Sequence, residues 1–265
     1  MKKNISTELR LAIDLVLLAG ESVMEVFNSF NLDISIKNDK SPLTKADRIS
    51  NEIICNNLKN TKIPVLSEEN MIDSYKVRKS WDKFWLIDPL DGTKEFIKKN
   101  KDFTINISLI ENYIPNLGVV FCPSTKEMFF AQKGFGSFKV VLDKFKFSKK
   151  DKFIKLPIHK PLLHQRIVVS KSHISKKTLE YIDKIDKKEI IKLGSSLKIC
   201  MVAEGKADIY PRFTPIMEWD VAAATAILIY NSENINKAFN LKFNSESLKL
   251  DSIIFKRNKI IFNEK

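Results

Sequence analysis

Residues 84–96 constrain the fold more than any other stretch, because a buried-type strand ends there in a turn that carries two carboxylates. The stretch begins with Phe84-Trp85-Leu86-Ile87. Four bulky apolar residues in a row predict a strand that is buried on both faces. Pro89 cannot donate to a sheet and favours an extended residue before it, so the strand is predicted to stop at Asp88.

The turn after this strand brings two acidic side chains together. Gly92 permits a sharp turn, and Asp91 or Thr93 is expected to cap a short helix over residues 94–97. The charges of Asp88 and Asp91 then repel each other unless a cation lies between them. Oxygen-only ligands suit a hard ion such as Mg²⁺. Spacing alone also allows a plainer interpretation, in which one aspartate caps the helix and the other is solvated.

Length and composition predict a folded, soluble protein. With 265 residues, 44% of them hydrophobic and 29% charged, the chain could form one large domain or two modest ones. Asp14 interrupts the longest apolar run, Leu11–Ala19, which is too short for a membrane helix. The three cysteines, Cys55, Cys122 and Cys200, are far apart and odd in number. They predict buried thiols and a cytoplasmic protein, and the histidine spacing gives no zinc motif.

Positive charge is concentrated in residues 133–192. The whole chain carries a net charge of +13, and this block holds 17 basic and 6 acidic residues, a net +11. Such a block could steer a polyanion, or draw the protein weakly to the inner face of the cell membrane. The chain is rich in lysine, isoleucine and asparagine throughout, which favours a solvated lysine-rich face. Nucleic acid is therefore not expected as a partner.

Further carboxylates stand at the ends of predicted elements. Asp47 completes a capping box at the start of a helix, where the helix dipole favours its charge. A short strand at 64–69 ends in adjacent acids, Glu68 and Glu69, and Asp220 begins a helix of small residues. Strands that repeatedly stop at acids converge those acids on one edge of a sheet. Each acid taken alone could equally be a capping or surface residue.

A second candidate feature is the helix that residues 194–196 open. Free backbone N–H groups at such a start can hold a phosphate, and Lys198 lies on the first turn. A plain surface lysine is an equally open interpretation of Lys198.

Four blocks of the sequence resemble the signature blocks of the inositol monophosphatase superfamily, which are metal-dependent, lithium-sensitive phosphatases. The blocks are residues 44–47, 66–69, 85–93 and 218–223, and the resemblance covers roughly residues 6–230. It implies an α/β fold, specifically the αβαβα layered sandwich shared with fructose-1,6-bisphosphatase.

Within the superfamily, the chain looks most similar to the CysQ-type 3′(2′),5′-bisphosphate nucleotidases. The details that carry this likeness are Glu95-Phe96, the segments 170–173 and 194–205, and Tyr210-Pro211-Arg212. Inositol phosphatases tend to carry an acid where Arg212 stands. An arginine there suits a second phosphate group, through bidentate charge-assisted bonds.

The resemblance implies a role for individual residues. Two or three Mg²⁺ ions would be held by Glu68, Asp88, Asp91, Asp220 and the backbone carbonyl of Leu90. Asp47 and Thr93 would orient and deprotonate the attacking water. Substrate contacts would come from Glu68, Gly92, Thr93, His173, Ser195, Lys198, Arg212 and Asp220.

The lysine-rich, irregular stretch from about 137 to 160 is the best candidate for an internal boundary. We expect one compact phosphatase unit with a metal-binding N-terminal α+β half (residues 1–140) and a substrate-binding C-terminal α/β half (residues 160–265). After the last signature block, residues 230–234 replace the Gly-Gly turn usual in the family. The sequence gives no indication of the oligomeric state.

The expected activity is Mg²⁺-dependent, lithium-sensitive hydrolysis of adenosine 3′,5′-bisphosphate to AMP and phosphate, a recycling step in sulfur metabolism. One alternative is an inositol monophosphatase or related sugar phosphatase on the same scaffold. A second is a non-catalytic nucleic-acid-binding protein that uses the basic block.

Overall fold

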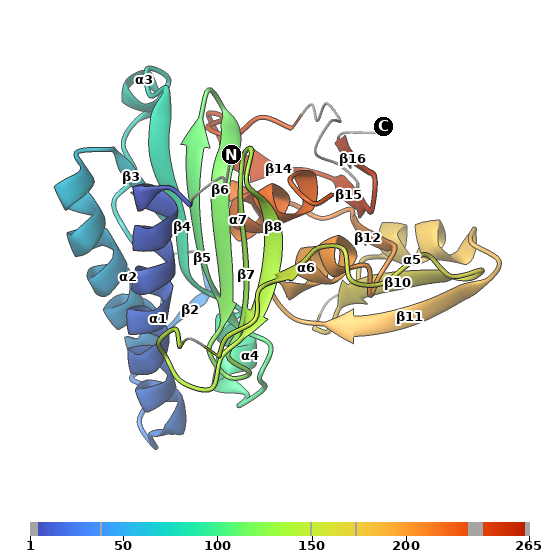
Figure 1. Cartoon of the computed structure of the whole chain (residues 1–265), viewed down its shortest axis with the longest axis horizontal. Coiled ribbons are helices and arrows are strands. Elements are labelled where there is room, and N and C mark those ends of the chain that lie inside the picture. Colours follow the sequence, from blue (N-terminus) through green and yellow to red (C-terminus); the bar gives the residue numbers. More distant parts are fainter. Residues whose placement is uncertain (1–4, 38, 149, 173, 233–240, 263–265) are drawn as a thin grey trace.

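Helices and sheets alternate in layers in the computed structural model of the chain (Figure 1), which describes residues 5–37, 39–148, 150–172, 174–232 and 241–262. Helices α1 and α2 cover one face of the large sheet. Helices α6 and α7 lie between the large sheet and a smaller one, and α5 packs on the smaller sheet. This arrangement confirms the predicted αβαβα sandwich.

The large sheet holds seven strands in the order β3-β4-β5-β6-β7-β8-β9 within the described residues. Only the β3–β4 pair is parallel in it. The strands are β3 (Val65–Ser67), β4 (Lys83–Asp91), β5 (Thr104–Glu111), β6 (Ile114–Cys122), β7 (Glu127–Gln132), β8 (Gly136–Val141) and β9 (Ile154–Lys155).

The smaller sheet has the order β11-β10-β12-β15-β16. Its strands are β10 (Gln165–Ser170), β11 (Lys188–Leu193), β12 (Ile209–Arg212), β15 (Ile253–Lys256) and β16 (Lys259–Phe262). Two short pairs complete the strands: β1 (Ser35–Ile36) with β2 (Pro42–Leu43), and β13 (Ile216–Met217) with β14 (Lys249–Leu250). The helices are α1 (Thr7–Asn28), α2 (Lys45–Leu58), α3 (Tyr75–Arg78), α4 (Thr93–Ile97), α5 (Lys176–Asp183), α6 (Leu197–Glu204), α7 (Glu218–Ile229) and the 3₁₀ turn Lys59–Thr61.

The first two helices begin at residues whose side chains cap them. The Leu9 N–H donates to Ser6 Oγ at 3.0 Å, which satisfies one of the free donors at the start of α1. At the start of α2, Thr44 and Asp47 form both bonds of a capping box. The capping prediction for Asp47 is therefore confirmed, although the same carboxylate also faces the site described below.

The alternation of side-chain directions along β4 places Asp88 on the face of the large sheet that packs against α7. Trp85 and Ile87 belong to the core beneath α1 and α2, whereas Phe84 and Leu86 belong to the core shared with α7. Successive side chains of a strand point to opposite faces. Asp88 therefore lies on the α7 face of the sheet, as does its cross-strand partner Asn106 on β5.

Two predictions about this strand were wrong. The strand does not stop at Asp88 but continues to Asp91 through a register shift, and a bulge of this kind accommodates the missing N–H of Pro89. Neither Asp91 nor Thr93 caps α4. Gly92 does so, with φ +93° and no side-chain cap bond, because the chain reverses there in a left-handed conformation that favours glycine.

Three weaker predictions also need correction. The stretch expected to be irregular, 137–160, contains most of β8 and all of β9, which extend the large sheet to Lys155. The sequence of residues 32–37 predicts a strand, but only β1 forms there, and the sequence of residues 175–187 predicts a helix, but α5 ends at Asp183. Exposed, lysine-rich segments carry little periodic signal, so their pairing depends on neighbours that are distant in the sequence.

Helix α7 is apolar on all sides because it is covered on all sides. Apart from Asp220, all its residues are buried, and it packs against the large sheet and against α6. Its close approach to β6 depends on Gly118. A Cβ atom at that position would lie 2.3 Å from the Ala223 carbonyl oxygen and 2.8 Å from the Ala226 Cβ.

We expect Gly118→Ala to lower the free energy of unfolding by about 2 kcal/mol, because overpacking a rigid core forces the backbone to move. Thermal or urea unfolding measures this change. Ile114→Ala on the same strand is the control, since Ile114 is 41% exposed and its loss should have little effect. Equal stabilities for the two variants would contradict the proposed close packing of α7.

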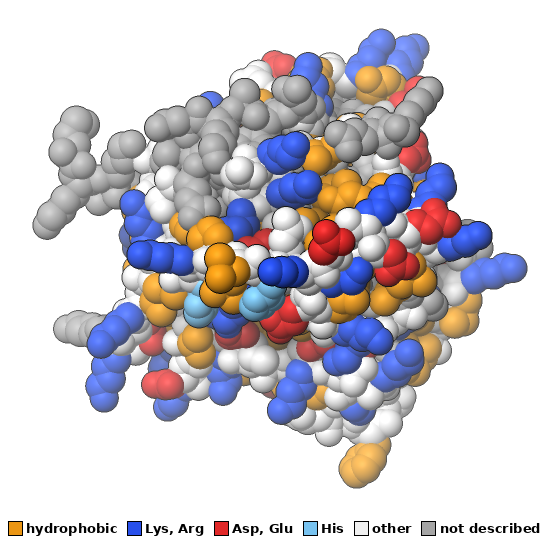
Figure 2. Space-filling view, turned by 90° about the vertical axis from the view of Figure 1, so that its right-hand side faces the viewer, with side chains coloured by type: hydrophobic (Ala, Val, Ile, Leu, Met, Phe, Trp, Pro, Cys, Tyr) orange, Lys and Arg blue, Asp and Glu red, His pale blue; other side chains and the backbone are white. Residues whose placement is uncertain are grey.

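No helix among the described residues is long and apolar enough to cross a membrane. On the right-hand side of the molecule as drawn in Figure 1, lysine and arginine side chains are spread over the surface with acidic and hydrophobic side chains among them (Figure 2). This distribution is the one expected of a solvated, lysine-rich face.

Candidate active site

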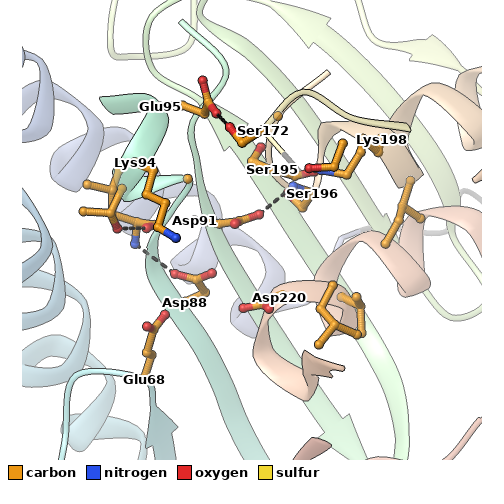
Figure 3. Close-up of a pocket in the computed structure, with 18 of the residues that line it drawn as sticks. Glu68, Asp88, Asp91, Lys94, Glu95, Ser172, Ser195, Ser196, Lys198 and Asp220 are labelled. Carbon is orange, nitrogen blue, oxygen red and sulfur yellow. Dashed lines mark hydrogen bonds between the residues drawn. The ribbon is translucent and has the colours of Figure 1, made fainter. Parts of the chain in front are cut away.

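A cavity of about 410 Å³ opens where the two sheets meet at α6 and α7. Its walls come from segments far apart in the sequence, including the end of β4, the 194–198 turn and the start of α7. Figure 3 shows the carboxylates of Glu68, Asp88 and Asp220 on one side of this cavity and the serines and lysine of the 194–198 turn on another. The topology therefore gathers the candidate residues into one place.

Three of the predicted metal ligands form a tight group. One oxygen each of Glu68, Asp88 and Asp220 lies within 4.8 Å of the others. Glu68 follows β3, Asp88 lies on β4, and Asp220 is in the first turn of α7, where its Oδ2 accepts the Met217 N–H at 3.2 Å. Asp91 lines the same cavity but is not a member of this group within the described residues.

The pKa values of these acids show how unfavourable their charges are without a counter-ion. Burial, and then the charges of Glu68, Asp91 and Asp220, raise the pKa of Asp88 well above its usual value. Burial, followed by the charges of Asp91 and Glu68, does the same to the pKa of Asp220. The Oδ2 atom of Asp88 is also buried without a hydrogen-bond partner.

This donor set fits a hard divalent cation. Every candidate donor is an oxygen, the charges converge, and a buried carboxylate oxygen is left without a partner. A cation among these oxygens would remove both the repulsion and the unsatisfied atom. Soft metals prefer sulfur or imidazole ligands, which this group lacks.

Lys37, which contacts the acids of the site, was not identified from the sequence. The Lys37 ammonium bridges Glu68 at 2.9 Å and Glu69 at 2.5 Å. Burial alone would lower the pKa of Lys37, but these two carboxylates outweigh it and raise that pKa. Because the chain carries 45 basic residues, no sequence signal distinguished this lysine from its neighbours.

Asp47 and Thr93 form the predicted pair. Thr93 Oγ donates to Asp47 Oδ1 at 2.9 Å and lies 3.2 Å from the Leu90 carbonyl oxygen. The other oxygen of Asp47 accepts from the N–H and the hydroxyl of Thr44. Burial raises the pKa of Asp47, although the hydrogen bonds from Thr44 and Thr93 oppose that shift. The carboxylate is thus held in a fixed orientation.

The 194–198 turn lies opposite the acids. Lys198 is 5% exposed, and its ammonium donates to the Ser195 carbonyl oxygen at 2.5 Å. The Ser196 N–H donates to Asp91 Oδ2 at 2.5 Å (Figure 3). Burial raises the pKa of Asp91, and the charge of Lys198 opposes the shift.

The remaining predicted substrate residues that the structure describes lie at or near this cavity. Gly92 and Arg212 line it, and the Arg212 guanidinium donates to the carbonyl oxygens of Thr214 and Pro215 at 3.3 and 3.1 Å. His173 lies outside the described residues.

Comparison with known proteins identifies the class to which this fold and site belong. The model of the inositol monophosphatase family matches residues 4–229 of the chain. The chain therefore belongs to the inositol monophosphatase family.

More specific similarity is to proteins named CysQ. The chain is 41% identical over 214 residues to the 3′(2′),5′-bisphosphate nucleotidase CysQ of Salmonella typhimurium, covering 80% of this chain and 82% of that protein. The crystal structure of CysQ from Bacteroides thetaiotaomicron has 38% identity, covers 98% of both chains and gives a TM-score of 0.82. An inositol monophosphatase from Thermotoga maritima shares the fold, with 22% identity, 95% and 92% coverage and a TM-score of 0.70.

We expect Asp88→Asn to stabilise the metal-free protein and to abolish its stabilisation by Mg²⁺. The substitution removes one buried charge from a group of like charges, so the gain should be on the order of 1 kcal/mol, or about 3 °C in Tm. Thermal unfolding in a chelator and in excess Mg²⁺ measures both effects.

Asp208→Asn is the matched control for this experiment. Asp208 pairs with Arg166 at 3.0 Å, and hydrogen bonds from Arg166 overcome its burial and lower its pKa. Its neutralisation should destabilise the protein and leave the Mg²⁺ response intact. A lower Tm for metal-free Asp88→Asn would contradict the repulsion argument.

Proposed function

We propose that the chain is a Mg²⁺-dependent 3′(2′),5′-bisphosphate nucleotidase that hydrolyses adenosine 3′,5′-bisphosphate to AMP and phosphate. The observation that carries this proposal is one cavity that is lined both by converging carboxylates and by the cationic side chains of Lys198 and Arg212. Such a cavity has one subsite for metal ions and the reacting phosphate, and a second, cationic subsite for another phosphate. The similarity to the CysQ nucleotidases supports the same assignment.

The proposed metal ligands are those expected from the sequence: Glu68, Asp88, Asp91, Asp220 and the Leu90 carbonyl. When bound, Mg²⁺ would supply charge neutralisation at the phosphate and a lower pKa for the attacking water. The backbone N–H groups of Gly92 and Thr93 would contact the reacting phosphate.

Asp47 and Thr93 would handle the proton of the attacking water. The Thr93 hydroxyl gives its hydrogen to Asp47, so its lone pairs remain available to accept a proton from water in the cavity. As water attacks phosphorus, the bond from phosphorus to the 3′ oxygen of the nucleotide breaks, and that oxygen takes up a proton from solvent water. The proton of the attacking water passes to Thr93 Oγ while the Thr93 proton moves to Asp47 Oδ1. The Thr44 bonds on the other oxygen keep Asp47 in place throughout.

The other phosphate of the nucleotide would bind Ser195, Lys198 and Arg212. Lys198 and Arg212 are cationic, and the guanidinium of Arg212 suits two phosphate oxygens at once. His173 stays a predicted contact of the same group. We further propose that residues 1–140 form a metal-binding half and that residues 160–265 form a substrate-binding half. We also propose that the protein acts in the cytoplasm.

Phosphate release from adenosine 3′,5′-bisphosphate and from inositol 1-phosphate, with Mg²⁺ and with or without Li⁺, tests the proposed activity. Lithium-sensitive release from the nucleotide is the expected result. Release from inositol 1-phosphate alone would favour the sugar-phosphatase alternative, and RNA binding without any hydrolysis would favour the nucleic-acid alternative.

We expect Thr93→Val to lower kcat at least about 100-fold, because the water loses its proton acceptor. Valine keeps the shape of threonine, so the increase in Tm that Mg²⁺ produces should persist. Thr125→Val, on an exposed turn, is the control. Retention of wild-type kcat by Thr93→Val would remove Thr93 from the mechanism.

We expect Arg212→Ala to raise KM for adenosine 3′,5′-bisphosphate about 10- to 100-fold, as the loss of a charge-assisted hydrogen bond predicts. Hydrolysis of adenosine 3′-monophosphate, which lacks the second phosphate, should hardly change. The control is Arg10→Ala on the exposed face of α1. An equal loss on both substrates would show that Arg212 does not select for the second phosphate.

A further inference from the structure

The inner face of β5 carries polar residues where a core strand would normally carry apolar ones. Ile105 and Ile107 point into the core beneath α1 and α2, and the alternating residues Thr104, Asn106 and Ser108 therefore face α7 and the C-terminal half. All three are buried, with exposures of 0%, 1% and 0%. Buried polar side chains need partners, and those of Thr104 and Asn106 come from the 194–198 turn.

Thr104 and Asn106 hold this turn through its two serines. Ser196 Oγ donates to Asn106 Oδ1 at 2.9 Å and shares a hydrogen bond of 2.9 Å with Thr104 Oγ. Thr104 Oγ also bonds to Ser195 Oγ at 3.2 Å. Ser195 needs such support because its φ is +50°, a left-handed conformation that costs a non-glycine residue about 1 kcal/mol or more.

The same turn holds a candidate metal ligand. The Ser196 N–H donates to Asp91 Oδ2, and Asp91 lies opposite Thr104 in the β4–β5 ladder. Asp91, Thr104 and Ser196 therefore form a closed set of contacts between the strand that carries the acids and the turn that carries Ser195 and Lys198. A shift of the turn would move Asp91, and a shift of Asp91 would move the turn.

We propose that Thr104 and Ser196 are positioning residues that couple the metal site to the subsite for the second phosphate. A metal ion that fixes Asp91 also fixes the Ser196 N–H, and the hydroxyl bonds of Ser196 and Thr104 pass that restraint on to Ser195 and the first turn of α6. The ion thereby pre-organises the second subsite, and by reciprocity a phosphate bound there favours metal binding by the same factor. This inference rests on the proposed function, since it assumes a ligand with a phosphate at Ser195 and Lys198.

Titration calorimetry with AMP, in a chelator and in saturating Mg²⁺, measures the coupling. AMP keeps the second phosphate and lacks the reacting one, so it reports on the distant subsite. For the wild type we expect Mg²⁺ to tighten AMP binding about tenfold, within the usual range of such couplings. The AMP ratio is the dissociation constant of AMP in the chelator divided by that in saturating Mg²⁺. For Thr104→Val and Ser196→Ala we expect this ratio to fall below about threefold.

Ser108→Ala is the matched control. Ser108 is a buried serine on the same face of the same strand, but its hydroxyl donates to the Leu117 carbonyl at 2.8 Å, away from the turn. Its loss should cost comparable stability and leave the AMP ratio unchanged. A purely structural role of Thr104 and Ser196 would lower Tm equally in all three variants without changing the ratio.

The outcomes separate the two proposals. A wild-type ratio in both Thr104→Val and Ser196→Ala would overturn the coupling and leave the nucleotidase assignment intact. A wild-type protein that binds no AMP in either condition, and releases no phosphate from the nucleotide, would overturn the proposed function itself. Loss of the ratio in Ser108→Ala as well would also reject the specific role of Thr104 and Ser196.

Discussion

Repulsion among carboxylates that are wholly or partly buried is the constraint on which the rest of this structure depends. Glu68, Asp88 and Asp220 come from three elements and meet within 4.8 Å, at the point where the two sheets converge. Such a group can persist only if the surrounding scaffold is stable enough to impose it. The seven-stranded sheet and the fully covered helix α7 provide that scaffold.

Helix α7 connects the tightly packed core of the protein to the carboxylates of the cavity. Its small residues let it pack closely against the large sheet, and the acid at its N-terminus faces the cavity. The start of α7 is itself anchored, because the buried carboxylate of Glu218 accepts the N–H groups of Asn244 and Ser245 at 2.5 and 2.9 Å. The position of Asp220 is thus set by core packing and by a buried hydrogen-bond network, rather than by a flexible loop.

The sequence predicted local features well and long-range contacts poorly. The capping box of Thr44 and Asp47 was readable because both partners lie within one turn of helix. The bulge at Pro89 was not, since it depends on how β4 pairs with β5. The contact of Ser196 with Asp91 joins residues 105 positions apart, and no periodicity in either segment indicates it. The family resemblance supplied the candidate residues, but only the folded chain shows which of them touch.

The alternation of polar and apolar residues in β5 also bears on how the sheet assembles. A slip of one residue in its pairing would turn Thr104, Asn106 and Ser108 into the core beneath α1 and would face Ile105 and Ile107 toward the serines of the 194–198 turn. Both changes would leave hydroxyl and amide groups without partners in an apolar interior. Thr104 and Asn106, which hold the 194–198 turn, therefore also disfavour mispaired forms of the central sheet while the chain folds.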